Sequence, residues 1–281
     1  MLNHQTADKL RALKLPAMAA EYIRQSETPV MDALTFDERA GMMADAEWTA
    51  RENSRIQKLT KEANLRLSGA CFADVDYRPS RKLDRAYMAR LSDFSWVKDA
   101  RNLILTGCTG TGKTWLACAF GSEACRKGLR VTFYRVNHLL AEMAAANAAG
   151  SAGKLLVRLK KQDILILDDW ALGTINPLEG RFLLEVFEER YREHSAIISA
   201  QLPVAQWHGI FEDSTVADAI LDRIVHNAYR LTLCGPSLRA SMPDDSGMGA
   251  PHGGDEVQNT GARGAKPSAD SQEDGDYHAV Q

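Results

Sequence analysis

The chain has 281 residues, of which 34 are Lys or Arg and 37 are Asp or Glu, so its formal net charge is −3, and 45% of its positions are hydrophobic. This composition is typical of a globular protein with one sizeable core and a smaller module. No run approaches the roughly 20 apolar residues of a membrane helix, and the N-terminus lacks the apolar stretch of a signal peptide, so we expect a cytoplasmic protein. The five cysteines form no CxxC pair, which argues against a disulfide framework or a zinc knuckle.

Residues 1–95 are predicted to form a mostly helical N-terminal domain. The stretch 5–26 has helical character and is broken at Pro16. Thr35 and Glu38 have the spacing of a capping box, which predicts the start of a second, longer helix. That helix is expected to run to about Leu67, because the stretch contains no proline and only one glycine.

The positive charge of this region is concentrated in residues 51–90, which hold ten bases and five acids. Arg51, Arg55 and Lys58 follow one another at helical spacing and share one face of the predicted helix. Taken alone, such a block is more often a solvated helix face than a nucleic-acid interface. DNA contact is the alternative, and its candidate residues are Arg51, Arg55, Lys58, Lys61 and Arg66.

Residues 96–240 are predicted to form an α/β domain with a doubly wound parallel sheet. Short apolar or β-branched runs alternate with helical stretches through this region. The predicted strands are 103–106, 131–134, 164–167, 196–199 and 229–233, and the predicted helices are 112–127, 137–147, 178–192 and 216–228. The run 164–167 is apolar without interruption, which is typical of a parallel strand buried on both faces.

The last 41 residues, 241–281, are predicted to form a disordered acidic tail. They contain no Leu, Ile, Phe or Trp and therefore bury too little apolar surface to offset the entropy lost on ordering. They hold eight acids and two bases, a net charge of −6, so residues 1–240 carry a net charge of +3. The whole-chain charge of −3 therefore does not exclude a nucleic-acid partner.

A complete phosphate-binding motif follows the first predicted strand. The pattern GxxxxGK[ST] is matched by Gly107, Cys108, Thr109, Gly110, Thr111, Gly112, Lys113 and Thr114. Backbone N–H groups of such a loop cradle phosphates, together with the N-terminus of the helix that follows. Lys113 is expected to reach the β- and γ-phosphates of ATP, and the Thr114 hydroxyl to bind Mg²⁺. A chance glycine-rich turn is the alternative, and the strand before the motif and the helix after it count against that alternative.

Two acidic residues follow the buried run 164–167. Asp168 is expected to complete the Mg²⁺ site with Thr114, because P-loop ATPases hold the ion with a carboxylate from another strand. Asp169 is placed where a carboxylate polarises the attacking water, although an acidic strand end without catalytic function is the alternative for both residues. Because a strand and a helix separate the two motifs, we expect strand 196–199 to lie between the P-loop strand and the strand of Asp168.

Three further polar residues are candidates for the reaction. Gln201 follows strand 196–199 at the expected level of the γ-phosphate, where an amide can both donate to and accept from water; an ordinary polar strand end is the alternative. Arg223 and Arg239 are candidates for an arginine that stabilises transition-state charge in a neighbouring subunit. A surface ion pair is the alternative for each arginine.

Together these motifs resemble the IstB-type helper ATPases of insertion-sequence transposition, which belong to the AAA+ superfamily and are close to DnaC-type helicase loaders. The resemblance covers about residues 5–240 and implies a P-loop AAA+ parallel sheet flanked by helices, preceded by a mostly helical domain. It rests on 107–114, 164–169 with Trp170, Gln201-Leu202-Pro203 with Trp207-His208, 219–223, and Gly235-x-Ser237-x-Arg239. It assigns Mg-ATP binding to Lys113, Thr114 and Asp168. It places Gln201 in the sensor position and Arg223 in the arginine-finger position.

The same resemblance implies an ATP-dependent homo-oligomer that binds double-stranded DNA and recruits or activates the transposase encoded by the same element. It favours DNA contact for the basic residues and names ATP and Mg²⁺ as cofactors. Many AAA+ proteins have Glu where Asp169 stands, so slow hydrolysis, stimulated by DNA or a partner, is expected. A DnaC-like replicative helicase loader is the alternative function. A small-molecule kinase is a third, and the chain offers no obvious lid insertion for it.

Overall fold

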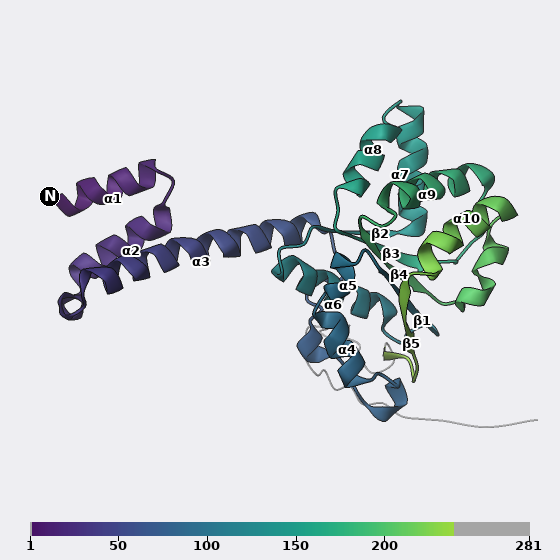
Figure 1. Cartoon of the computed structure of the whole chain (residues 1–281), viewed down its shortest axis with the longest axis horizontal. Coiled ribbons are helices and arrows are strands. Elements are labelled where there is room, and N and C mark those ends of the chain that lie inside the picture. The colour runs from purple at the N-terminus through teal and green to yellow at the C-terminus, as the bar shows by residue number, and fades with distance from the viewer. Residues whose placement is uncertain (1, 239–281) are drawn as a thin grey trace, which may run out of the picture. The chain divides into compact units, whose positions relative to one another are not determined.

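The computed structural model describes residues 2–238 (Figure 1). The part before the sheet is helical, as predicted. Its elements are α1 (Leu2–Ala12), α2 (Pro16–Glu27), the 3₁₀ helix η1 (Pro29–Ala33), α3 (Phe36–Glu62), η2 (Phe72–Asp74), η3 (Pro79–Arg81), α4 (Arg85–Ser92) and α5 (Ser95–Lys98). The predicted acidic tail, 241–281, lies outside the described residues.

Helix α3 begins as the sequence predicts but ends earlier. The Thr35 hydroxyl accepts the N–H of Glu38 at 3.3 Å, and the Glu38 carboxylate accepts the N–H of Thr35 at 2.8 Å, so the predicted capping box is confirmed. The helix ends at Glu62 rather than near Leu67. The following Asn64 has a left-handed φ of +50°, and the Ala63 carbonyl accepts the N–H of Phe133. The chain therefore leaves the helix to pair with the edge of the sheet.

Helices α1, α2 and α3, which we call the N-terminal helices, are joined to one another by a polar contact more than by a large core. The Glu47 carboxylate accepts the N–H groups of Ala17 and Met18 in the first turn of α2, at 3.0 and 3.1 Å. Among the described side chains, the fully buried apolar ones here are alanines, Ala7 and Ala19. None of the helices that the structure describes has the length and apolarity needed to cross a membrane.

Among the described residues, 102–233 contain a five-stranded sheet in which every pair is parallel, as predicted (Figure 1). Its strands are β1 (Asn102–Gly107), β2 (Val131–Arg135), β3 (Ile164–Trp170), β4 (Ser195–Ala200) and β5 (Ala228–Leu233). The strand order is β2-β3-β4-β1-β5, so β4 lies between the P-loop strand and the strand of Asp168. The expected place of strand 196–199 between these two strands is confirmed.

The helices of this part alternate with the strands and cover both faces of the sheet. They are α6 (Lys113–Arg126), α7 (Val136–Ala148), α8 (Ala152–Lys160), α9 (Pro177–Arg190), the 3₁₀ helix η4 (Val204–Ile210) and α10 (Ser214–Val225). Helix α8 was not predicted. It follows directly on α7, and its apolar residues Leu155 and Leu159 pack into the core.

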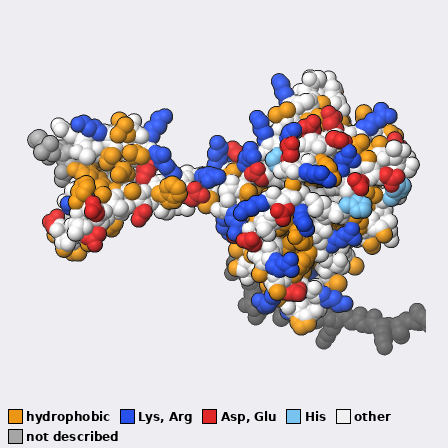
Figure 2. Space-filling view, in the orientation of Figure 1, with side chains coloured by type: hydrophobic (Ala, Val, Ile, Leu, Met, Phe, Trp, Pro, Cys, Tyr) orange, Lys and Arg blue, Asp and Glu red, His pale blue; other side chains and the backbone are white. Residues whose placement is uncertain are grey.

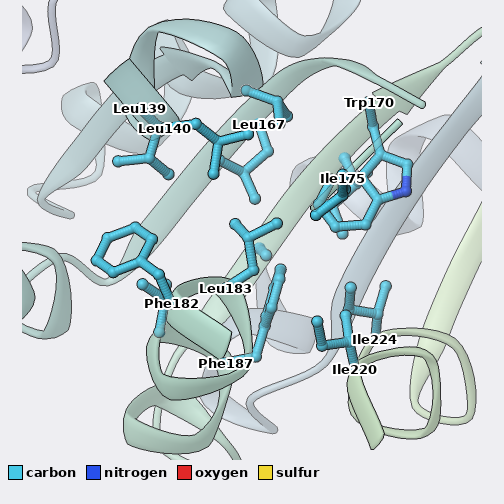
Figure 3. Packing of buried hydrophobic residues seen from close by; sticks show 14 of the residues in the cluster. Leu139, Leu140, Leu167, Trp170, Ile175, Phe182, Leu183, Phe187, Ile220 and Ile224 are labelled. Carbon is cyan, nitrogen blue, oxygen red and sulfur yellow. The ribbon is translucent and has the colours of Figure 1, made fainter. Parts of the chain in front are cut away.

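Side chains of each central strand alternate between two hydrophobic clusters. In β3, Leu165 and Leu167 pack with α7, α8, α9 and α10, and Figure 3 shows Leu167 facing Leu139, Leu140 and Leu183 across this cluster. Ile164 and Ile166 of the same strand pack on the other face with α6. Because period-2 alternation sends neighbouring side chains to opposite faces, a continuous apolar run is what a strand buried on both faces requires.

Residues 63–98 contribute to the second cluster rather than to the N-terminal helices. Met88, Leu91 and Trp96 pack with Phe120 of α6 in one buried group. Helices α4 and α5 are therefore part of the layer that covers the α6 face of the sheet. The predicted domain boundary at residues 95 and 96 stays a prediction.

Candidate nucleotide-binding site

The loop 107–114 connects the carboxyl end of β1 to helix α6 and has the conformation that its glycines were expected to allow. Gly107 has a φ of +148°, and a Cβ there would lie 2.3 Å from the carbonyl oxygen of Leu233. Gly110 has a φ of +81°, and a Cβ there would lie 2.1 Å from the Ser237 hydroxyl. Any side chain at either position would displace β5 or the segment that follows it. The glycines let the loop curl tightly against that part of the chain.

Lys113 is the first residue of α6, and its side chain is buried beneath the loop. Its Nζ donates to the carbonyl oxygens of Gly107 and Cys108, at 2.7 and 2.8 Å. Helix α6 has no side-chain N-cap, because Gly112 occupies that position. The positive dipole end of the helix therefore lies beside a lysine that spans the loop, and such a helix terminus stabilises an anion.

Asp168 lies at the carboxyl end of β3 and is completely buried. The Thr114 hydroxyl donates to its two carboxylate oxygens, at 3.0 and 2.9 Å, and the Ser199 hydroxyl of β4 also donates to it. A buried carboxylate is costly unless hydrogen bonds or a cation compensate it. The oxygen atoms of Thr114 and Asp168 are the hard donors that Mg²⁺ prefers, so these residues fit a magnesium site.

Gln201 lies just beyond the end of β4 and contacts the loop directly. The Thr109 hydroxyl donates to its side-chain oxygen at 2.8 Å. The position of β4 between β1 and β3 explains this contact, because parallel strands bring their carboxyl ends to the same edge. The structure therefore brings the predicted loop, Asp168 and Gln201 together at one edge of the sheet.

Asp169 is adjacent to Asp168 but has a different neighbour. Its backbone is left-handed, with a φ of +61°, at the place where the register between β3 and β4 shifts. Its carboxylate lies 3.7 Å from Nε of Arg135, at the end of β2. As a base for an attacking water it would have to leave this ion pair.

Arg223 is not brought to the P-loop of its own chain. It lies near the end of α10, where Asn102, the first residue of β1, donates to its carbonyl oxygen at 3.2 Å. Its guanidinium donates to both carboxylate oxygens of Glu188, at 2.9 Å each. Since the P-loop follows the opposite end of β1, Arg223 lies at the amino edge of the sheet, away from the P-loop of its own chain. Arg239 lies outside the described residues.

The cations predicted to contact DNA are all exposed, and three of them form ion pairs along α3. Arg51 donates to Glu47 at 2.8 Å and also to the carbonyl oxygen of Lys14. Arg55 and Lys58 lie 3.8 and 3.9 Å from Glu52 and Glu62 respectively. Arg66 lines a groove of about 560 Å³ beside Arg135. Figure 2 shows that Lys and Arg side chains are interspersed with Asp and Glu over the visible surface.

Ser199, Arg135 and Arg81 contact the site or its immediate surroundings and were not among the predicted site residues. Ser199 was predictable from the sequence, because it precedes Gln201 in a strand expected beside that of Asp168. For Arg135 the only indication in the sequence was its place at the end of a predicted strand. For Arg81 there was no indication in the sequence, since it is one of ten bases in a charged region and is buried only through tertiary contacts.

Comparison with known proteins agrees with this geometry. Residues 8–245 match the family model described as IstB-like ATP binding protein. A Sinorhizobium fredii protein named as insertion sequence ATP-binding protein y4pL is 41% identical over 242 residues, which are 86% of this chain and 98% of that protein. A Pseudomonas fluorescens protein named as the ATP-binding protein of insertion sequence IS1162 is 40% identical over 72% of this chain and 88% of that protein.

Two solved structures share the fold. DnaI has a TM-score of 0.50 and 22% sequence identity, over 60% of this chain and 90% of that chain. AMPPCP-bound DnaA from Aquifex aeolicus has a TM-score of 0.50 and 18% identity, over 59% of this chain and half of that chain. Both likenesses concern the P-loop AAA+ architecture alone.

Proposed function

The chain belongs to the IstB-like ATP-binding family of AAA+ proteins, and from this premise we propose that it is a magnesium-dependent ATPase of an insertion sequence. In this proposal ATP drives assembly of a homo-oligomer on duplex DNA, and the assembly recruits or activates the transposase of the same element. The observation that carries the ATPase part is the contact of Thr114 with the buried Asp168 beside the P-loop.

Each group of the site has a part in this reaction. The N–H groups of the loop and Lys113 would hold the phosphates, and Thr114 and Asp168 would hold Mg²⁺, which neutralises charge on the β- and γ-phosphates. Gln201 would orient the attacking water, and Asp169 would accept its proton. Because Asp169 is paired with Arg135, slow hydrolysis that a partner accelerates is expected.

The position of Arg223 supports an oligomer. An arginine that stabilises transition-state charge must approach the γ-phosphate, and Arg223 lies at the opposite edge of the sheet from its own P-loop. A head-to-tail arrangement of copies would bring the amino edge of one sheet to the carboxyl edge of the next. Arg223 would then exchange Glu188 for the nucleotide of the neighbouring subunit.

The N-terminal helices support a macromolecular partner. Exposed cations on α3 would bind phosphates of the duplex without reading its sequence. Large apolar side chains are also exposed on α3 and on the preceding η1, among them Val30, Phe36 and Trp48, each at least 74% accessible. Such side chains are suited to contact with another protein, for which the transposase is our candidate.

The test is duplex binding and sedimentation, measured with and without Mg-ATP, for wild type, Lys113→Ala and Lys127→Ala. Lys127 follows the last turn of the same helix and is exposed, so its variant controls for loss of a cation. We expect ATP-dependent assembly on DNA for wild type and Lys127→Ala, and none for Lys113→Ala. Nucleotide-independent binding by a protein that stays monomeric would contradict the proposal. Assembly on a replicative helicase without duplex binding would support a helicase loader instead.

A further inference from the structure

Arg81 is a buried arginine that contacts the backbone of the P-loop. It is the last residue of η3, its side chain is 3% exposed, and the next residue, Lys82, turns the chain away with a left-handed φ of +52°. Its Nη1 donates to the carbonyl oxygens of Thr111 and Cys234, each at 3.3 Å. One arginine thus links the loop to the end of β5.

The contact with Thr111 bears on the face of the loop that receives phosphate. In a trans peptide the carbonyl oxygen and the N–H of the next residue point in opposite directions. Because Arg81 donates to the Thr111 oxygen, the Gly112 N–H points away from Arg81. In a phosphate-binding loop, inward N–H groups and outward carbonyls are what make the cradle.

A second carbonyl of the loop is held by the segment that follows β5. The N–H of Leu238 donates to the Gly110 oxygen at 2.9 Å. Arg81 also anchors the start of that segment, because the Cys234 N–H donates to the Arg81 carbonyl at 3.4 Å. The P-loop and the residues that follow β5 are thus held by one set of hydrogen bonds.

The guanidinium is itself held in place by Asp76, which accepts from Nε at 3.2 Å. Arg78 also donates to Asp76, and hydrogen bonds from Arg78 and Arg81 keep the pKa of Asp76 well below its usual range. Asp76 is consequently ionised at neutral pH and fixes the direction of the Arg81 fork. The second terminal nitrogen, Nη2, is buried without a partner among the described residues.

Arg190 is a second buried arginine in the same fold, and its hydrogen bonds hold backbone carbonyls at the other edge of the sheet. It is also 3% exposed, and it donates to the carbonyl oxygens of Leu159, Gln162 and Ser195 at the amino edge of the sheet. Burial lowers its pKa to about 10, so it stays charged at neutral pH. Both terminal nitrogens of Arg190 donate hydrogen bonds. In Arg81, Nη1 contacts the phosphate-binding loop and Nη2 has no partner among the described residues.

We propose that Arg81 is a positioning residue of the nucleotide site, which orients the peptide between Thr111 and Gly112 so that the Gly112 N–H faces the phosphates. The inference rests on the proposed ATP binding and adds to it a residue that no phosphate motif contains. It predicts an effect on nucleotide affinity rather than on the chemical step, because Arg81 acts on the loop through a backbone carbonyl.

The experiment compares Arg81→Met with Arg190→Met as the matched loss of a buried arginine. Affinity for ATP and for ADP is measured by calorimetry at a temperature where both variants are folded, together with KM and kcat. Arg81→Met should weaken both nucleotides about tenfold and raise KM to the same degree, with kcat unchanged at saturating ATP. Arg190→Met should lower thermal stability and leave both affinities at the wild-type value.

Arg81→Lys provides the decision if Arg81→Met does not fold. Lysine has one terminal nitrogen, which cannot occupy the positions of both Nη1 and Nε of Arg81. We therefore expect about a two- to fivefold loss of affinity, between wild type and Arg81→Met. Wild-type affinity in a folded Arg81 variant would overturn the inference and leave the proposed function intact. Failure of the wild-type protein itself to bind ATP would instead refute the proposed function.

Discussion

At the carboxyl end of the sheet the buried carboxylate of Asp168 is hydrogen-bonded to side chains of other elements, whereas exposed cations of α3 pair with carboxylates of their own helix. Asp168 is fully buried and accepts from hydroxyls on two other elements, α6 and β4. Lys58, by contrast, is 75% exposed and lies 3.9 Å from Glu62, one turn away. One region is assembled by tertiary contacts, and the other is a single helix face.

This difference in burial determines how far the function of each region can be inferred from its structure. A buried carboxylate is retained only where partners or an ion compensate its desolvation, so its surroundings identify its chemistry. Exposed pairs at i,i+3 and i,i+4 contribute little to stability and form on solvated helices and on DNA-binding helices alike. The carboxyl edge therefore predicts a reaction, and α3 predicts only a salt-dependent attraction.

The largest expected effect concerns Asp169. Asp169→Asn should lower kcat about 100-fold while ATP affinity and duplex binding stay at wild-type values, because the amide cannot accept a proton from water. Steady-state hydrolysis and equilibrium binding measure the two parts. Asp163→Asn, which changes a carboxylate just before the amino end of the same strand, is the control and should leave kcat unaltered. Unchanged turnover in Asp169→Asn would remove Asp169 from the reaction.

A smaller effect is expected at Ser199. Ser199→Ala removes the hydroxyl that holds Asp168 from β4, and we expect about a tenfold loss of apparent Mg²⁺ affinity, as is usual for residues that orient a metal ligand. Titration of ATPase activity with Mg²⁺ measures it. Ser195→Ala is the control. Ser195 lies at the other end of β4, and its hydroxyl has no partner among the described residues, so this variant should leave the titration unchanged. Equal curves for both variants would show that Ser199 does not orient the ligand.

The smallest expected effect would show whether α3 binds DNA at all. Lys58→Gln should weaken duplex binding a few-fold at moderate salt and reduce the slope of log affinity against log salt by about 1. Glu62→Gln removes the carboxylate that pairs with Lys58 and should act in the opposite direction. Fluorescence anisotropy over a series of salt concentrations measures both. If neither variant changes the slope, this face is solvated and the DNA interface lies elsewhere.

Much of the nucleotide site was predictable because its residues occur in local patterns. The loop 107–114 is continuous in sequence, and Asp168 follows an apolar run that is typical of a buried strand. The position of β4 between β1 and β3 was also predictable, since a strand and a helix separate the two motifs. The end of α3 at Glu62 was not predictable, because the chain there forms a hydrogen bond between Ala63 and Phe133 of a distant strand.

The sequence by itself determined the helical N-terminal region, the parallel sheet and the phosphate-binding loop, because periodicity, capping residues and glycine spacing act over a few residues. Only the tertiary structure decided that Ser199 holds Asp168, that Arg135 pairs with Asp169 and that Arg81 is buried and contacts the loop. These contacts join residues about 30 or more positions apart. Their side chains become specific only when the order of the strands brings them together and burial makes each unpaired polar group costly.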